Sequence, residues 1–315
     1  MKIPDNAKHR KRIVLIASSI LILFIIFILF YTRFIFTPPP LPIPEGERRM
    51  DQFGTLQIYP TVQNGREWFI NMQDPFDDEI VSFNSDIALD QHSDNSWRVN
   101  SSKVRLRVDT LPGQEEWKNV EMTGYVRMIS STLTAGSNEF SDHEEGSEDG
   151  DSSDPHLTWR ARGGRHNDMV PCEGTALNGG LYFDGKVSWK KEIWHTGGYT
   201  DARGVSEIPN SLVNKWIGWK TIIYNLDSDS SVKMESYLDI NANNNWNKIS
   251  EVEDNGKWYA DSSDEEFYSV DCGKEKDYVI TNSGPTATFR ADNLIFDFKN
   301  LSIREIIPPQ KKGEL

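Results

Sequence analysis

Residues 104–108 read VRLRV, an alternation of apolar and basic side chains without exception. Successive side chains of a β-strand point to opposite faces, so this pattern predicts a strand with one buried and one solvated face. The same period of two recurs over residues 120–128, 232–239 and 295–305. Many such strands, separated by Gly, Asn and Asp, predict an all-β fold: an antiparallel two-sheet jelly-roll sandwich.

The N-terminus predicts a membrane anchor. A basic segment, residues 1–12, precedes an apolar one, residues 13–36, and residues 13–31 carry no charge. As a helix, nineteen residues at about 1.5 Å each just span a hydrocarbon core of about 30 Å. Lys and Arg accumulate on the cytoplasmic side of such spans, which predicts a single-pass protein with a cytoplasmic N-terminus and an extracellular C-terminal part.

A cleaved signal peptide is the alternative interpretation of this segment. Its apolar region usually has about 7–15 residues and ends at a small-residue cleavage site. Here the apolar run is longer, and the residues that follow, 32–36, read TRFIF and offer no such site. Both interpretations place the rest of the chain outside the cytoplasm.

The remaining chain divides by composition. Residues 37–52 begin with a Pro-rich stretch, which predicts an extended polyproline II stalk. Residues 53–306 form the predicted jelly-roll domain, and residues 307–315 form a short polar tail. Within the domain, residues 136–155 hold eight acidic residues and almost no apolar ones, a composition that predicts a flexible loop.

The charge balance excludes one class of partner. The whole chain carries a net charge of −14, and residues 1–50 contribute eight Lys or Arg and three Asp or Glu, a net +5. Subtracting +5 from −14 leaves −19 on residues 51–315. Such an acidic domain repels nucleic acid, so we expect no nucleic-acid partner.

Cys172 and Cys272 are the two cysteines of the chain. In an exported domain an even cysteine count predicts a disulfide. Closing a loop of this length contributes on the order of 4–5 kcal/mol in the chain-entropy model. Two free buried thiols are the alternative, but in an oxidising compartment both would be open to oxidation.

Residues 157–199 concentrate the side chains that suit a sugar ligand. In this block Arg160 and Arg162 alternate with apolar residues, and several Trp and Tyr residues follow. Aromatic rings stack on the apolar faces of sugars, and guanidinium groups bind hydroxyls or carboxylates through two parallel hydrogen bonds. We therefore expect a glycan-binding site that includes the side chains of Arg160, Arg165, Trp194 and His195.

Structural roles compete with this interpretation. The arginines at 160, 162 and 165 would also suit ion pairs with the acidic loop, an internal clamp that competes with an anionic ligand. At least half of the tryptophans in the domain are expected in the core, and His195 also suits a turn.

Five segments carry a resemblance to a known superfamily: residues 65–68 (GREW), 117–128 (WKNVEMTGYVRM), 179–189 (GGLYFDGKVSW), 243–248 (NNNWNK) and 298–306 (FKNLSIREI). The chain resembles the concanavalin A-like lectin/glucanase jelly rolls and, within them, the alginate-lyase-like sandwiches; it is also similar to exported archaeal proteins. The resemblance covers most of residues 53–306 and supports the jelly-roll prediction.

The resemblance to alginate lyases implies β-elimination on a uronate polymer. An Arg would neutralise the carboxylate, a His or Tyr would remove the neighbouring proton, and a Tyr would protonate the leaving oxygen. The implied catalytic residues are Arg160 or Arg162, His166, and Tyr182 or Tyr199. The sequence lacks the Arg-x-Glu-Leu and Gln-Ile-His patterns of those enzymes, and it lacks the Glu-x-Asp-x-x-Glu pattern of the retaining glucanases.

A calcium site is a further prediction, since lectin-like sandwiches often hold this ion. Asp239, Asn241 and Asn243 place oxygen-bearing side chains at alternate positions, as the first ligands of a calcium loop do. Gly at the sixth position and Glu at the twelfth are missing, so a hairpin turn rich in Asn is the alternative.

Together these patterns predict a membrane-anchored extracellular domain that recognises polysaccharide or a cell-surface glycan. A polysaccharide lyase is one alternative. A structural protein of the cell envelope without a glycan ligand is the other.

Overall fold

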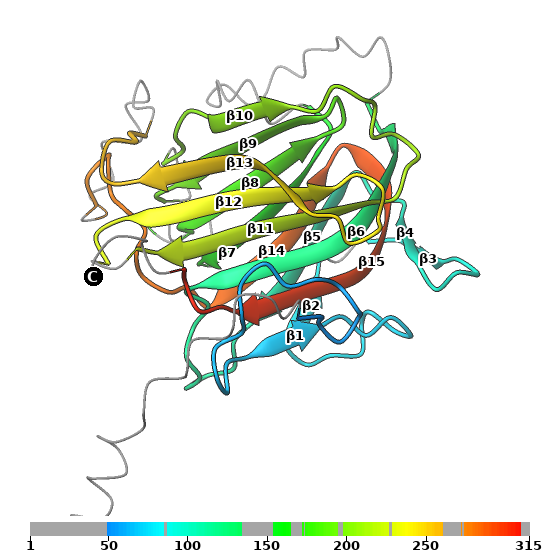
Figure 1. The fold of residues 1–315 in the computed structure, drawn as a ribbon, viewed down its shortest axis with the longest axis horizontal. Coiled ribbons are helices and arrows are strands. Elements are labelled where there is room, and N and C mark those ends of the chain that lie inside the picture. The colour runs from blue at the N-terminus through cyan, green and yellow to red at the C-terminus, as the bar shows by residue number, and fades with distance from the viewer. Residues whose placement is uncertain are drawn as a thin grey trace, which may run out of the picture. The chain divides into compact units, whose positions relative to one another are not determined.

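The computed structural model describes residues 49–84, 87–133, 154–164, 172, 174–194, 198–226, 229–260, 272 and 274–309. These residues form fifteen β-strands and no helix, which confirms the all-β prediction (Figure 1). No helix in this described part is long and apolar enough to cross a membrane. The predicted anchor, nearly all of the stalk and acidic loop, and most of the tail lie outside the described residues.

One layer of the fold is an eight-stranded sheet in which all strand pairs are antiparallel. β1 (Glu67–Phe69) pairs with β15, and the other seven strands follow one another in this order: β13 (Asn247–Asp254), β12 (Val232–Asp239), β11 (Ile217–Asn225), β6 (Val120–Ser131), β15 (Leu294–Glu305), β4 (Trp97–Val99) and β3 (Leu89–Gln91).

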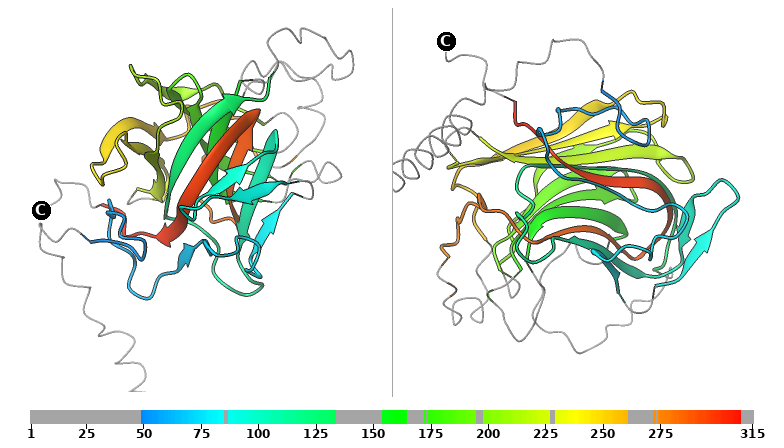
Figure 2. Two further views of the ribbon diagram at one scale, coloured as in Figure 1. Left: turned by 90° about the vertical axis from the view of Figure 1, so that its right-hand side faces the viewer. Right: turned by 90° about the horizontal axis from the view of Figure 1, so that it is seen from below.

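The other layer is a seven-stranded antiparallel sheet. Its order is β10 (Arg203–Glu207), β9 (Lys186–Glu192), β8 (Ala176–Tyr182), β7 (His156–Gly163), β14 (Thr286–Asp292), β5 (Lys103–Asp109) and β2 (Val81–Phe83). The chain crosses repeatedly from one sheet to the other, and Figure 2 shows the two sheets as stacked layers. The predicted two-sheet antiparallel sandwich is therefore confirmed.

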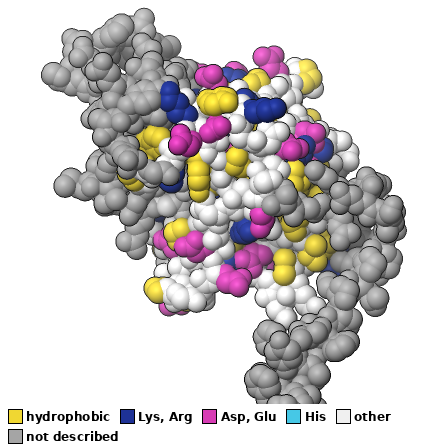
Figure 3. Space-filling model, turned by 90° about the vertical axis from the view of Figure 1, so that its left-hand side faces the viewer, with side chains coloured by type: hydrophobic (Ala, Val, Ile, Leu, Met, Phe, Trp, Pro, Cys, Tyr) yellow, Lys and Arg dark blue, Asp and Glu magenta, His cyan; other side chains and the backbone are white. Residues whose placement is uncertain are grey.

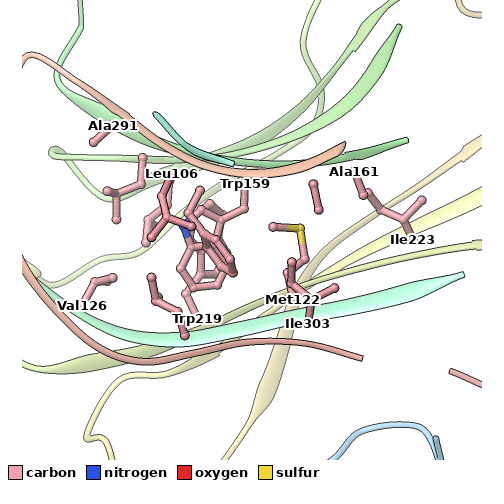
Figure 4. Close-up of a cluster of buried hydrophobic side chains, with 14 of the residues drawn as sticks. Leu106, Met122, Val126, Trp159, Ala161, Trp219, Ile223, Ala291 and Ile303 are labelled. Atoms are coloured by element: carbon pink, nitrogen blue, oxygen red, sulfur yellow. The ribbon is translucent and has the colours of Figure 1, made fainter. Parts of the chain in front are cut away.

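The core lies between the sheets and is filled by aromatic rings. Trp159 of β7 meets Trp219 of β11 with their ring centroids 4.4 Å apart (Figure 4). Gly124 and Gly179 make room for this packing: a Cβ on Gly124 would lie 3.1 Å from the Trp159 ring, and one on Gly179 would lie 2.7 Å from Thr221. Both positions need glycine because the two layers approach each other closely there.

The predicted disulfide between Cys172 and Cys272 is present, with the two Cα atoms 5.1 Å apart. Beside it, the Lys274 ammonium donates to the backbone carbonyls of Cys172, at 3.4 Å, and Ile193, at 3.0 Å. The bridge closes a loop over 100 positions of sequence that contains strands of both sheets. It therefore links distant parts of the chain.

Candidate functional site

The candidate site is the outer face of the seven-stranded sheet, the face turned away from the core. On β7 the side chains of Leu157, Trp159 and Ala161 belong to the core cluster. The strand alternation therefore places His156 and Arg160 on the outer face. The outward positions of five neighbouring strands, β5, β14, β7, β8 and β9, form this face.

The strand register brings these outward side chains into rows. Arg105 of β5 lies directly opposite Arg290 of β14, which lies opposite Thr158 of β7. In the next row, Thr288 of β14 lies between Arg107 and Arg160. The register continues each row onto β8 and β9, so side chains from distant parts of the sequence share one surface.

This face is basic although the domain is acidic. On its five strands the outward positions hold seven Lys or Arg and three Asp or Glu; they are Lys103, Arg105, Arg107, Arg160, Lys186, Lys190 and Arg290, against Asp109, Glu192 and Asp292. Figure 3 shows a different side of the molecule, where acidic and basic side chains lie interspersed. The excess of cations on this sheet face is therefore a local feature.

A buried ion pair occupies one end of the face. Arg160, 6% exposed, donates to the carboxylate of the fully buried Glu192 at 3.1 Å. Tyr199 lies opposite Glu192 in an isolated β-bridge. Burial, and then the negative charge of Glu192, raise the pKa of Tyr199, so its hydroxyl stays protonated at neutral pH.

A second cluster occupies the other end. Asp292 accepts a hydrogen bond from Arg290 and lies 3.9 Å from the His156 ring nitrogen. The His156 and Tyr182 rings stack with centroids 5.1 Å apart, and the Lys186 ammonium lies 4.9 Å from the Tyr182 ring centroid. This end therefore combines a carboxylate, an imidazole and a phenol.

Neutral hydrogen-bonding side chains lie between the charged ones. Thr158, Asn178, Ser188, Thr286 and Thr288 point outward on β7, β8, β9 and β14 and are buried. The long cations at 103, 105, 107, 186 and 190 are more exposed and surround them. A ligand on this face would therefore meet the cations first, because the neutral side chains between them are at most 9% exposed.

Of the predicted site residues, Arg160, Tyr182 and Tyr199 come together on this face. Arg162 does not join them, although alternation places it beside Arg160. Its backbone has a φ of 59°, which breaks the strand geometry, and its guanidinium donates to the carbonyls of Lys118, at 2.8 Å, and Ile280, at 2.7 Å. Burial lowers the pKa of Arg162 to about 9. Arg162 thus serves to join loops and offers a ligand no exposed surface.

Four predicted glycan-binding or catalytic residues remain, and the structure describes one of them, Trp194. Trp194 is 4% exposed and packs with Ile193 and Ala260 in a small apolar cluster, so its ring offers little surface for stacking. Arg165, His166 and His195 lie outside the described residues, and their roles stay predictions.

The predicted calcium loop forms the turn between β12 and β13. The Asp239 carboxylate accepts a hydrogen bond from the Asn244 backbone N–H at 2.6 Å, and the φ of Asn244 is 65°. Asn241 and Asn243 are exposed. No group of three or more His, Cys, Asp or Glu that could hold a metal ion occurs among the described residues. The hairpin geometry is therefore observed, and calcium binding stays a prediction.

Sequence reasoning missed Arg105, Arg290, His156 and Glu192 as site residues. The alternation of residues 104–108 gave one usable signal, because it placed Arg105 and Arg107 opposite the core side. Nothing local to β5 or β14 indicates that they are neighbours.

No family model matches this sequence, and no curated protein matches it. Among solved structures the chain is similar to peanut lectin with a 9mer peptide, with 9% identity and a TM-score of 0.37 over 78% of this chain and 100% of that one. It is also similar to the Emp47p carbohydrate recognition domain, with 8% identity and a TM-score of 0.40 over 73% and 90%. Winged bean acidic lectin complexed with methyl-α-D-galactose gives 6% identity and a TM-score of 0.41 over 78% and 100%. Two of these structures are lectins and the third is a carbohydrate recognition domain.

Proposed function

We propose that this chain is a membrane-anchored extracellular domain that recognises polysaccharide through the outer face of its seven-stranded sheet. The observation that carries the proposal is the composition of that face, where the cations at 103, 105, 107, 186 and 190 on the two outer strands flank rows of neutral hydrogen-bonding side chains and two further arginines. At about 4.8 Å per strand spacing, five strands give a surface about 19 Å wide, broad enough for an extended chain of sugars.

Binding is tested by electrophoresis of the purified full chain, in detergent, through native gels that contain a soluble polysaccharide. A panel of neutral and acidic polymers retards the protein if the face binds glycans. Lys190→Ala, on β9 at this face, should weaken the retardation. Lys248→Ala, on β13 of the other sheet, is the matched control and should leave it unchanged. Absence of retardation by every polymer would favour a structural envelope protein without a glycan ligand.

The anchor and the extracellular location form the second part of the proposal. Their support is the uncharged segment 13–31 behind a basic N-terminus. Deletion of residues 1–36 should move the protein from the membrane fraction to the soluble fraction. External protease should cleave the domain on intact cells and leave a cytoplasmic control protein intact. Resistance on intact cells together with cleavage after lysis would refute the extracellular location.

A polysaccharide lyase is the second candidate function. Its support is that Arg160, Tyr182 and Tyr199, three of the residues that the resemblance implies, share one sheet face; Arg160 and Tyr199 lie at one end of this face, and Tyr182 lies at the other, stacked on His156. The reaction creates an unsaturated uronate, whose ultraviolet absorbance would rise during incubation with alginate, pectate or glucuronan. Tyr199→Phe should abolish that rise if Tyr199 donates the proton. No rise with any polymer would leave the binding function alone.

A further inference from the structure

Two arginines of the candidate face oppose each other across neighbouring strands. Arg105 of β5 and Arg290 of β14 are direct partners in the antiparallel register. Like charges at directly opposite positions destabilise a sheet unless an anion separates them. The electrostatic influence of Arg160 and Arg107 on Arg105 adds to this repulsion.

The neighbouring cations already have carboxylate partners. Arg290 donates to Asp292, and Arg160 donates to Glu192. The guanidinium of Arg105 has no such ion pair within the part of the chain that the structure describes; the hydrogen bond of this residue is a backbone one, from its N–H to the Asn84 side chain. Burial, and then the charge of Arg290, lower the pKa of Arg105, and the charge of the Asp292 carboxylate offsets this only in part. Arg105 is thus a half-buried cation that its own surroundings disfavour.

We infer that Arg105 binds an anionic group of the glycan, a carboxylate or a sulfate ester, beside Arg290. This inference rests on the proposed function and names the ligand class of the same face. The anionic group of the ligand would bind Arg105 rather than Arg160, because the Arg160 guanidinium already forms an ion pair with Glu192.

The chemistry of Arg105 suits such a group. A guanidinium presents parallel N–H donors that match the two oxygens of a carboxylate or of a sulfate. In the adjacent row Arg107 lies on the same strand, two residues further along, and is likewise partly exposed. An acidic sugar would place its anionic group on Arg105, with Arg107 beside it as a second cation.

The test compares polymers that differ in charge alone. The full chain in detergent is titrated with a polyuronate and its carboxyl-reduced form, and with dextran sulfate and dextran. The expected result is at least about tenfold tighter binding to the acidic member of one or both pairs, since a charge-assisted hydrogen bond contributes roughly a factor of ten or more. A preference in the uronate pair identifies carboxylate as the ligand group, and a preference in the dextran pair identifies sulfate.

Substitutions test whether Arg105 causes the preference for the acidic polymer. Arg105→Met should reduce it to within about threefold, and Arg105→Lys should retain part of it, because an ammonium keeps the charge and loses the paired donors. Lys248→Met removes the same charge from the other sheet and should leave the preference intact. If Arg105→Met fails to fold, the partial loss in Arg105→Lys carries the test.

Two outcomes separate failure of this inference from failure of the proposed function. Equal binding of the acidic and neutral polymers, or a preference that Arg105→Met leaves unchanged, would overturn the inference while the polysaccharide function stands. Binding of none of the four polymers would overturn both.

Discussion

The outer faces of the two sheets both bury charged side chains, but they differ in whether those charges have partners of opposite sign. On the eight-stranded sheet, Glu121 accepts from Lys220 at 2.7 Å and from Arg304 at 2.8 Å, and all three side chains are almost fully buried. Each of these three charges has an opposite partner. On the seven-stranded sheet, Arg105 faces Arg290 and lacks an ion pair within the described residues.

The N-terminal segment of the domain completes the eight-stranded face. The Ile58 backbone N–H donates to Glu121 at 3.2 Å, the Tyr59 hydroxyl donates to Glu235 at 2.8 Å, and Arg304 donates to the Thr61 hydroxyl at 2.8 Å. Residues 58–61 therefore satisfy polar groups that the sheet alone leaves open.

In this sandwich, charged side chains that stabilise the fold differ from candidate ligand-binding ones in whether they have a partner of opposite charge. Burial alone does not mark a binding face, because Glu121 is as buried as Glu192. What differs is the balance of partners. Where each buried charge is matched within the chain, its role is stability; where a cation is left opposite another cation, the missing partner is a candidate ligand.

The largest effect is expected on the eight-stranded sheet. Glu121→Gln leaves Lys220 and Arg304 buried without a counter-charge, and breaking such a network costs about 3–5 kcal/mol of the free energy of unfolding. Urea denaturation measures the loss. Glu251→Gln is the control, because the Glu251 carboxylate is 47% exposed, and an exposed pair contributes at most about 1 kcal/mol. Equal effects of the two substitutions would contradict a stabilising role for the buried network that exceeds that of an exposed ion pair.

Acid should abolish the stabilisation by Glu121. Burial alone would raise the pKa of this carboxyl, but Lys220 and Arg304 lower it from its usual 4.5 to about 2. Because the pKa is lower in the folded state, the stabilisation is complete above about pH 4.5 and is lost as the pH falls toward about 2, a change on the order of 3 kcal/mol. The stability difference between the wild type and Glu121→Gln should therefore shrink over this range; a constant difference would refute the assignment.

The smallest effect is expected at Arg105. Arg105→Met removes one of two opposed cations, so the free energy of unfolding should stay within about 0.5 kcal/mol or rise by up to about 1 kcal/mol. Arg160→Met on the same face should lose about 3–5 kcal/mol, because it leaves Glu192 buried without its counter-charge. Thermal and urea unfolding of the two variants measure the contrast. A large loss in Arg105→Met would mean that Arg105 stabilises the fold.

Strand periodicity predicted most of the fold. The alternation over residues 295–305 predicted the closing strand observed as β15, Leu294–Glu305. The alternation over residues 120–128 likewise predicted that Glu121 and Thr123 point away from the core, as they do on β6. The two faces of a strand follow from the period of two, so a single sequence is enough for this level of structure.

The candidate site was predicted only in part, for two physical reasons. The alternation that placed Arg160 correctly failed two residues later, because the positive φ of Arg162 turns its side chain into the loops. The opposition of Arg105 and Arg290 depends on the pairing of β5 with β14, strands that are far apart in sequence. Register between distant strands is set by the packing of the whole sandwich, and no local pattern encodes it.

Strands β14 and β15 have a consequence for the order of assembly. β14 lies between β7 and β5 in one sheet, and β15 lies between β6 and β4 in the other (Figure 1). During translation, residues 286–305 emerge after all the other described strands, so each layer lacks its middle until then. The nascent chain therefore leaves the edges of β5, β7, β4 and β6 unpaired, and β1 without its partner, until these residues arrive. Neither sheet can therefore close before these residues are available, and the rate at which the last two of the described strands insert should limit folding.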